Sequence, residues 1–292
     1  MNENSAPLSL YGFADACADF DHRHPQWPAV LTRLWNAINM AFTRRQTMSE
    51  PIDKFVYFYG NLVAEDFMEL FLMAVNGYGF GAMKLLRSMY EHTIVLKYLH
   101  EHPEEFDNFF DFDRVQQRKL MYQVFDIFGR DALSAEAIAA TESRFEEVKE
   151  RFTIKSCGVK NCTCTHTRVN HTWSKLDFVA MAKQTGDIGK MLVNAYHVPL
   201  RHAHPTVRTM MERLEMNEGH LGFSREFQPK EADDALMTAH NCLLVALDVQ
   251  RERFKIPGLQ EAVSNAVIDW ALIWSPESVT KLRADAGLSS PT

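Results

Sequence analysis

A long run of apolar side chains at helical spacing most constrains what this chain can fold into. The run covers residues 55–77, where glycines begin to break it. Its apolar positions recur every three or four residues, as in an amphipathic helix, and do not alternate as in a half-buried strand. The stripe consists of Val63, Phe67, Leu70, Phe71 and Ala74. The pattern therefore predicts a long helix that buries one face.

The same spacing recurs along most of the chain and predicts an all-α protein. Further helices are expected over residues 82–100, 103–128, 134–151, 173–185, 188–202 and 231–254. The helix starting at Pro103 opens with a proline and two glutamates, which suit the first turn and the positive end of the helix dipole. Its expected buried residues are Phe106, Phe109, Phe110, Leu120, Val124 and Phe125.

The simplest arrangement of these helices is a single helical bundle with a Cys/His-containing loop. We expect an N-terminal helical appendage at residues 1–50, a bundle core at residues 51–256, and C-terminal helices with a tail at residues 257–292. The tail is expected to be mobile after Gly287.

Composition and charge narrow the class of protein further. Hydrophobic residues make up 46% of the 292 residues and the net charge is −7. A sizeable core is therefore available, and bulk electrostatics argue against a protein that coats RNA or DNA. The N-terminus lacks a secretory signal, and no apolar run reaches the roughly 18 residues of a membrane span. These features predict a cytoplasmic protein without a membrane partner.

A short glycine-containing turn predicts that the helices on either side of it pack as an antiparallel pair. Residues equally far from the turn then lie level, Glu69 with Arg87 and Glu65 with Glu91. Such a group fits an ion-pair network at the edge of a bundle. It also fits a binding site, since neighbouring carboxylates raise each other's proton affinity unless a cation is supplied. A dinuclear carboxylate centre is a poor match, because a histidine directly follows Glu91 in place of the expected Glu-x-x-His.

A second concentration of polar groups lies at residues 196–204. Tyr196, Leu200 and His204 are four apart and share one helical face if Pro199 only kinks the helix. His204 lies near a helix end, where exposed carbonyl groups influence its protonation and hydrogen bonds. Two histidines beside Arg201 are equally compatible with a solvated helix end.

The order of these features resembles the bacterial proteins grouped as domain of unknown function 5677. The resemblance rests on these features in this order: the glycine turn, GAMKLLRSMYEHTIVLKYL, HPEEFDNFFDFDRVQQRKL, a tryptophan, and Tyr196 with the later His204-Pro-Thr. The resemblance covers about residues 52–213. Its most specific pieces are Arg87-x-x-x-Glu91 and the segment from Tyr196 to His204.

The resemblance implies a helical layout like that of nuclease-like modules in prokaryotic toxin and antiphage systems, the HEPN class. Active members of that class carry an arginine that steadies a scissile phosphate, and a histidine four to six residues later that moves the 2′-hydroxyl proton. This chain departs from the pattern, because histidines follow Arg201 at the first and third positions. It also has Leu200 where family members often place a serine.

Two functions of the polar residues remain open. The first is a helical module that binds an unknown small molecule or protein partner, which an apolar pocket edged by Glu91 and His204 would favour. The second is an RNA-processing or toxin-type enzyme using Arg87, Glu91, Arg201 and His204, with Tyr196 as an orienting residue. It requires Arg87 and His204 to lie within about 10 Å of each other. Self-association is open in both cases.

A third alternative is a zinc-stabilised protein, because three of the five cysteines fall within one short stretch. Cys157, Cys162, Cys164 and His166, with His171 close behind, offer enough soft ligands for a tetrahedral structural zinc. The spacing departs from the usual Cys-x-x-Cys frameworks. Reversible thiol oxidation and an unligated polar loop therefore remain open beside zinc.

Overall fold

The computed structural model describes residues 8–9, 12–13, 15–43, 48–155, 167–204, 206–217, 219–224 and 226–280. Helices dominate this part of the chain, and its strands form only short antiparallel pairs, which confirms the predicted all-α class. The pairs are β1 (Leu8–Ser9) with β2 (Gly12–Phe13), β3 (Thr153–Lys155) with β4 (Thr167–Val169), and β5 (Leu214–Asn217) with β6 (His220–Phe223). None of the described helices has the length and apolar character needed to span a bilayer. The tail after Gly287 lies outside the described residues.

Two compact units make up the chain. The bundle unit combines Met1–His100 with Ala182–Thr292, and the middle unit is Glu101–Met181. The residues on both sides of positions 50 and 256, where the sequence predicts boundaries, belong to the bundle unit.

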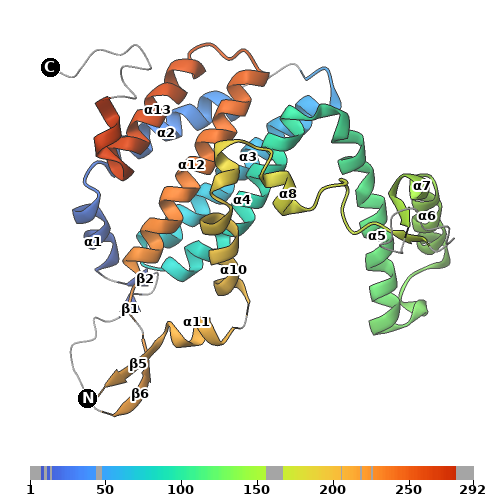
Figure 1. Ribbon diagram of the computed structural model, residues 1–292, viewed down its shortest axis with the longest axis horizontal. Coiled ribbons are helices and arrows are strands. Elements are labelled where there is room, and N and C mark those ends of the chain that lie inside the picture. Colours follow the sequence, from blue (N-terminus) through green and yellow to red (C-terminus); the bar gives the residue numbers. More distant parts are fainter. Residues whose placement is uncertain are drawn as a thin grey trace. The chain divides into compact units, whose positions relative to one another are not determined.

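The bundle unit is built on two long helices that pack closely together, as Figure 1 shows. In α12 (Pro229–Arg253) the buried Gln250 donates from Nε2 to the carbonyl oxygen of Val56 in α3 (Pro51–Val75), at 2.7 Å. This close approach depends on Gly60, because a Cβ there would overlap the Gln250 amide. The other helices of the unit are α1 (Ala16–Arg23), α2 (Trp27–Phe42), α4 (Gly79–Glu101), α9 (Asp187–Lys190), α10 (Val198–Ala203), α11 (Val207–Met211) and α13 (Leu259–Trp274).

The hairpin of α3 and α4 confirms the helices predicted over residues 55–77 and 82–100. Pro51 occupies the first turn of α3 behind a capping box formed by Glu50 and Asp53, which satisfies free backbone groups at the helix start. Gly77 makes the turn at a φ of +84°, a conformation that favours glycine. The two helices then run back along each other.

The helices predicted over residues 173–185 and 188–202 are instead broken into short pieces. They are α8 (Phe178–Ala182), α9, a π-helical turn η3 (Val193–His197) and α10. Gly186, with a φ of +67°, lies between α8 and α9 as the N-cap of α9. Pro199 lies in the first turn of α10, where its missing N–H is tolerated. Local backbone chemistry therefore overrides the apolar periodicity here.

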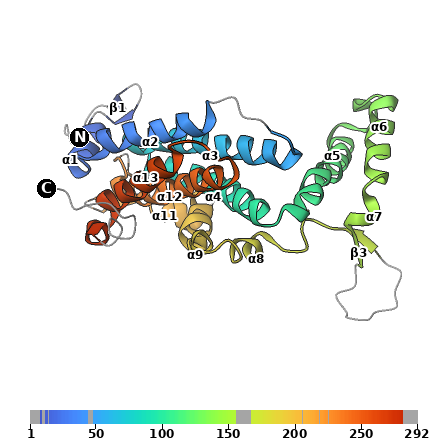
Figure 2. The same ribbon diagram turned by 90° about the horizontal axis from the view of Figure 1, so that it is seen from above.

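The middle unit packs α5 (Phe106–Phe128) against α6 (Ala135–Glu146) and α7 (Lys149–Phe152), and Figure 2 shows α6 beside α5. The prediction of burial is wrong for two residues of α5, since Phe110 is 66% and Leu120 is 60% exposed. Ion pairs from Arg114 and Arg118 to the α6 side, at 2.6 and 2.8 Å, show which face of α5 points inward. The small core consists of Phe112, Val115, Phe145, Val148 and Phe152, with Val169 and Trp173 packed against it.

Candidate functional site

Four of the five candidate residues meet around one guanidinium in the bundle unit. Arg87 Nε donates to Glu91 Oε1 at 3.0 Å. The two terminal nitrogens of Arg87 lie 3.4 Å from the Tyr196 hydroxyl oxygen and 3.4 Å from His204 Nε2. The guanidinium carbon also lies 4.7 Å from the centre of the Tyr196 ring, a cation–π arrangement. We call these four residues the Arg87 site.

Helix α4 supplies Arg87 and Glu91 from successive turns, which are neighbours on a helix surface. Their side chains are 25% and 39% exposed, so the pair is open to solvent on one side. The neighbouring face of α4 is buried and includes Tyr90, whose hydroxyl donates to the Ile188 carbonyl at 3.1 Å. That bond fixes the start of the segment carrying Tyr196 and His204 against α4.

Tyr196 belongs to the π-helical turn η3. The N–H of Val198 donates to the carbonyl of Val193, five residues back instead of the usual four. Such turns hold one more residue than an α-helical turn and often occur at functional sites. The half-buried Tyr196 ring is thereby placed over Arg87.

His204 reaches Arg87 because it leaves the helix. It follows α10 in an extended conformation, with φ −113° and ψ 152°, as expected of a residue before a proline. The predicted single helical face through Tyr196, Leu200 and His204 is therefore wrong, although the outer two residues still meet at Arg87. Arginine has no acceptor, so His204 Nε2 accepts in this contact and a neutral ring carries its hydrogen on Nδ1.

Arg201 does not join the other four candidates. Its side chain is exposed, and its carbonyl accepts the hydroxyls of Thr206 and Thr209. Across the described residues its guanidinium makes no hydrogen bond or ion pair to the Arg87 site.

The neighbouring His202 is buried and stacks on Phe80 at 4.8 Å between ring centres. Burial lowers the pKa of His202, so this histidine packs as a neutral ring.

The predicted four-charge cluster of Glu65, Glu69, Arg87 and Glu91 does not form. The carboxylate of α3 that meets α4 is Asp66, whose Oδ2 lies 2.7 Å from Nδ1 of His92. The residues of α3 and α4 that lie at the same height along the pair are close to those predicted. However, successive residues on a helix point about 100° apart, so Asp66 points toward α4 and Glu65 does not. Glu65 and Glu69 consequently line a cavity facing α2.

The predicted metal ligands Cys157, Cys162, Cys164 and His166 lie outside the described residues. The pairing of β3 with β4 sets Lys155 opposite Thr167 and so holds the two ends of this stretch side by side. Elsewhere in the described part of the chain, no group of three or more histidine, cysteine or acidic residues is arranged to hold a metal ion.

Two cavities lie away from the Arg87 site, within separate units. One of about 570 Å³ lies between α2 and α3 in the bundle unit. Another of about 530 Å³ lies in the middle unit beside Arg118, Tyr122 and His171. Neither cavity is edged by Glu91 or His204, so neither is the pocket that would favour the binding-module hypothesis.

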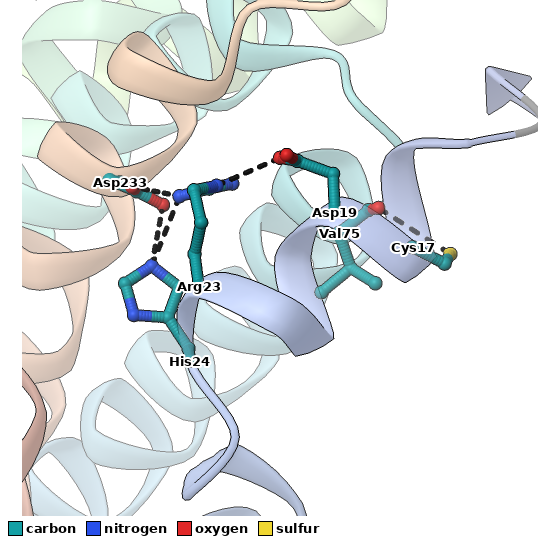
Figure 3. A network of polar contacts seen from close by, with 6 residues as sticks. All are labelled: Cys17, Asp19, Arg23, His24, Val75 and Asp233. Carbon is teal, nitrogen blue, oxygen red and sulfur yellow. Dashed lines mark hydrogen bonds and ion pairs between the residues drawn. The ribbon is translucent and has the colours of Figure 1, made fainter.

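A second polar network, which the sequence did not reveal, ties α1 to α12 (Figure 3). Arg23 donates to Asp19 at 2.8 Å and also pairs with Asp233, while His24 Nε2 lies 2.9 Å from Asp233 Oδ1. Burial disfavours the charged form of Asp233, but hydrogen bonds from His24 and Arg23 outweigh it and lower the pKa of this carboxyl. The chain separation of 210 residues between Arg23 and Asp233 leaves no spacing signal. Because its members satisfy one another, the network acts as a structural link.

Comparison with known proteins supplies a family for this arrangement. No curated protein and no solved structure gave a match. The profile of one family, described as a family of unknown function (DUF5677), matches residues 63–221, a span that contains all four residues of the Arg87 site. Because this match covers more than half of the chain, the protein belongs to the DUF5677 family of unknown function.

Proposed function

We propose that this protein is a helical binding module whose Arg87 site holds a phosphate-bearing ligand. The supporting observation is the position of the two terminal nitrogens of Arg87, each 3.4 Å from a polar atom of Tyr196 or His204. Those distances lie at the long end of the hydrogen-bond range, so a ligand oxygen can replace either partner. An arginine fork matches two phosphate oxygens at once.

Glu91 has a positioning role in this proposal. It occupies Nε of Arg87 at 3.0 Å and leaves the terminal nitrogens directed toward Tyr196 and His204. Tyr196 can donate its hydroxyl hydrogen and His204 a ring hydrogen to the same ligand. Without a ligand, the charges of Arg87 and Glu91 would nearly cancel. With a ligand, α4, η3 and the residue after α10 would each supply a hydrogen-bond donor.

Titration of the full chain with pyrophosphate, followed by phosphorus NMR, tests the proposal. Arg87→Gln removes the fork and should weaken binding at least tenfold. Arg208→Gln is a matched control, because Arg208 also pairs with a glutamate four residues later, Glu212 at 2.7 Å, on an exposed helix. Equal binding by the wild type and Arg87→Gln, or equal losses in both variants, would contradict the proposal.

The distance between Arg87 and His204 favours cleavage of RNA as a second candidate function. A neutral His204 would accept the 2′-hydroxyl proton while the 2′-oxygen bonds to phosphorus and the bond to the 5′-oxygen breaks. Arg87 would stabilise the charge on the phosphoryl oxygens. The 5′-oxygen takes a proton from water, which leaves a 2′,3′-cyclic phosphate and a 5′-hydroxyl. The local positions of histidine after Arg201 differ from the HEPN pattern, so this activity rests on the three-dimensional contact alone.

Incubation with a mixed-sequence oligoribonucleotide tests this second function. The products should carry a 2′,3′-cyclic phosphate, and His204→Gln should lower the rate at least a hundredfold. His220→Gln, in the exposed strand β6, is the control and should cleave at the wild-type rate. Binding of the RNA without cleavage would leave the binding function and refute the catalytic one.

A further inference from the structure

The cavity between α2 and α3 has the size and lining of a small-molecule site. Its volume of about 570 Å³ falls within the range of ligand pockets. Side chains of Trp35, Ile38 and Phe42 from α2 and of Met68 from α3 form apolar walls. These residues recur at three- and four-residue spacing on facing helices, so the cavity belongs to the helix packing of the bundle unit.

Two aromatic contacts fix the register of the helices that bound this cavity. Trp27 lies 5.5 Å from Phe71 at one end, and Phe42 lies 5.9 Å from Tyr57 at the other, between ring centres. The helices therefore run in opposite directions, and Trp35 lies about level with Ala64. The Trp35 side chain is 47% exposed, so an aromatic face is available at the carboxylate-bearing part of the cavity.

The acidic groups of the cavity have no cation to neutralise them within the described residues. Glu65 and Glu69 both line it from successive turns of α3, and Asn61 Nδ2 orients Glu65 through a 2.9 Å hydrogen bond. No lysine, arginine or histidine of the described chain forms an ion pair with either carboxylate. By the same register Arg33 lies level with Glu65, yet it donates twice to Asp269 at 2.6 Å. Its guanidinium is thus committed elsewhere.

We propose that this cavity binds an organic amine with an apolar body. The ammonium group would lie between Glu65 and Glu69 at the Trp35 ring, since aromatic faces and carboxylates both attract cations. The apolar body would cover Ile38, Phe42 and Met68. A metal ion is a poorer fit because only two carboxylates converge there, and an anion would be repelled by both. The proposal is independent of the Arg87 site.

A pair of probes that differ mainly in charge tests this assignment. Phenethylamine and the neutral 2-phenylethanol are titrated into the full chain, and saturation-transfer NMR gives the two affinities. The amine should bind at least tenfold more tightly, and added salt should reduce that preference. Equal affinities, or no binding of phenethylamine to the wild type, would overturn the proposal.

The double variant Glu65→Gln/Glu69→Gln locates the binding. It should remove the preference for the amine while leaving 2-phenylethanol binding unchanged. Glu226→Gln/Glu261→Gln removes two exposed carboxylates from other parts of the bundle unit and should bind both probes as the wild type does. A preference that survives in the first variant, or is lost equally in both, would show that the amine binds elsewhere or through net charge alone.

Discussion

At the scale of single residues, His240 is a titratable side chain that the bundle unit removes from water. It is completely buried, and burial lowers its pKa to about 3 from an ordinary 6.5. Its ring stacks on Trp27 at 5.3 Å, and Trp274 Nε1 donates to its Nδ1 at 3.4 Å. Its Nε2 has no hydrogen-bond partner in the described structure. The bundle unit therefore holds this histidine neutral at physiological pH.

This burial predicts that the protein loses stability as the pH falls from 7 toward 4. Below pH 6.5 the unfolded chain binds a proton at His240 that the folded chain does not, which costs about 1.4 kcal/mol of unfolding free energy per pH unit. The lowered pKa of His202 acts in the same direction. His240→Phe should flatten this slope by about one proton. Urea unfolding at pH 7, 6 and 5 measures it.

His220→Phe is the control for that experiment, because His220 is exposed in β6 and should leave the slope unchanged. An unchanged slope in His240→Phe would mean that the buried ring takes up its proton in the folded state.

The candidate site shows which residue-scale features a sequence can predict. The Arg87–Glu91 pair follows from helical spacing alone, because four residues separate them. Tyr196 and His204 could be singled out as chemistry-bearing residues, but their contact with Arg87 depends on a π-helical turn and on an extended residue before a proline. A rotation of one helix by about 100° likewise decides that Asp66, and neither Glu65 nor Glu69, meets α4. Periodicity does not fix such rotations.

At the scale of elements, Gly60 permits α3 and α12 to approach closely. Gly60→Ala should destabilise the bundle unit by about 1–3 kcal/mol, since the added methyl displaces the Gln250 amide from its buried bond to Val56. Gly81→Ala is the matched control in α4, where a Cβ would meet Met73 Sδ at an acceptable 3.4 Å. That change should add up to about 1 kcal/mol of stability, because alanine favours helix. Stabilisation by both changes in urea unfolding would contradict this account of the helix contact.

The β3–β4 pair is the element that carries the zinc prediction. Its register closes the ends of a stretch containing Cys157, Cys162, Cys164 and His166. If these residues bind zinc, mass spectrometry on protein purified without a metal-affinity tag should find about one zinc per chain. Cys162→Ser/Cys164→Ser should lose the metal, whereas Cys17→Ser, which alters an exposed thiol, should keep it. Protein without zinc would exclude the metal and leave a redox or unligated loop.

At the scale of the whole molecule, the two compact units should unfold separately. The middle unit has a small core, and Phe145→Ala should lower its stability by about 3–5 kcal/mol while leaving the bundle unit unchanged. Leu243→Ala, in the buried face of α12, should act only on the bundle unit. Calorimetry of the full chain distinguishes the two transitions. A single transition shifted equally by both changes would contradict the division.

Much of the helical architecture was accessible from the sequence because it depends on local periodicity. The long helices α3, α4 and α12 and the extent of α5 agree with their predicted ranges within a few residues. The grouping of residues 182–292 with the first hundred was not accessible, since it depends on contacts between distant segments. The broken helices between residues 173 and 204 escaped prediction for a local reason, the glycines and proline that reset the backbone there.

The π-helical turn at Val193–His197 has a further consequence for how this protein can vary. A π-turn is equivalent to one residue added to an α-helix. It therefore determines the directions in which the side chains after the turn point, relative to those before it. Loss of any one of the other residues there would rotate Tyr196 relative to the rest of the segment. Geometry of this kind tolerates changes of side chain at Val193 or Asn194, which are exposed, but depends on the number of residues. Variation in length, more than variation in composition, would therefore separate relatives that retain the Arg87 site from those that have lost it.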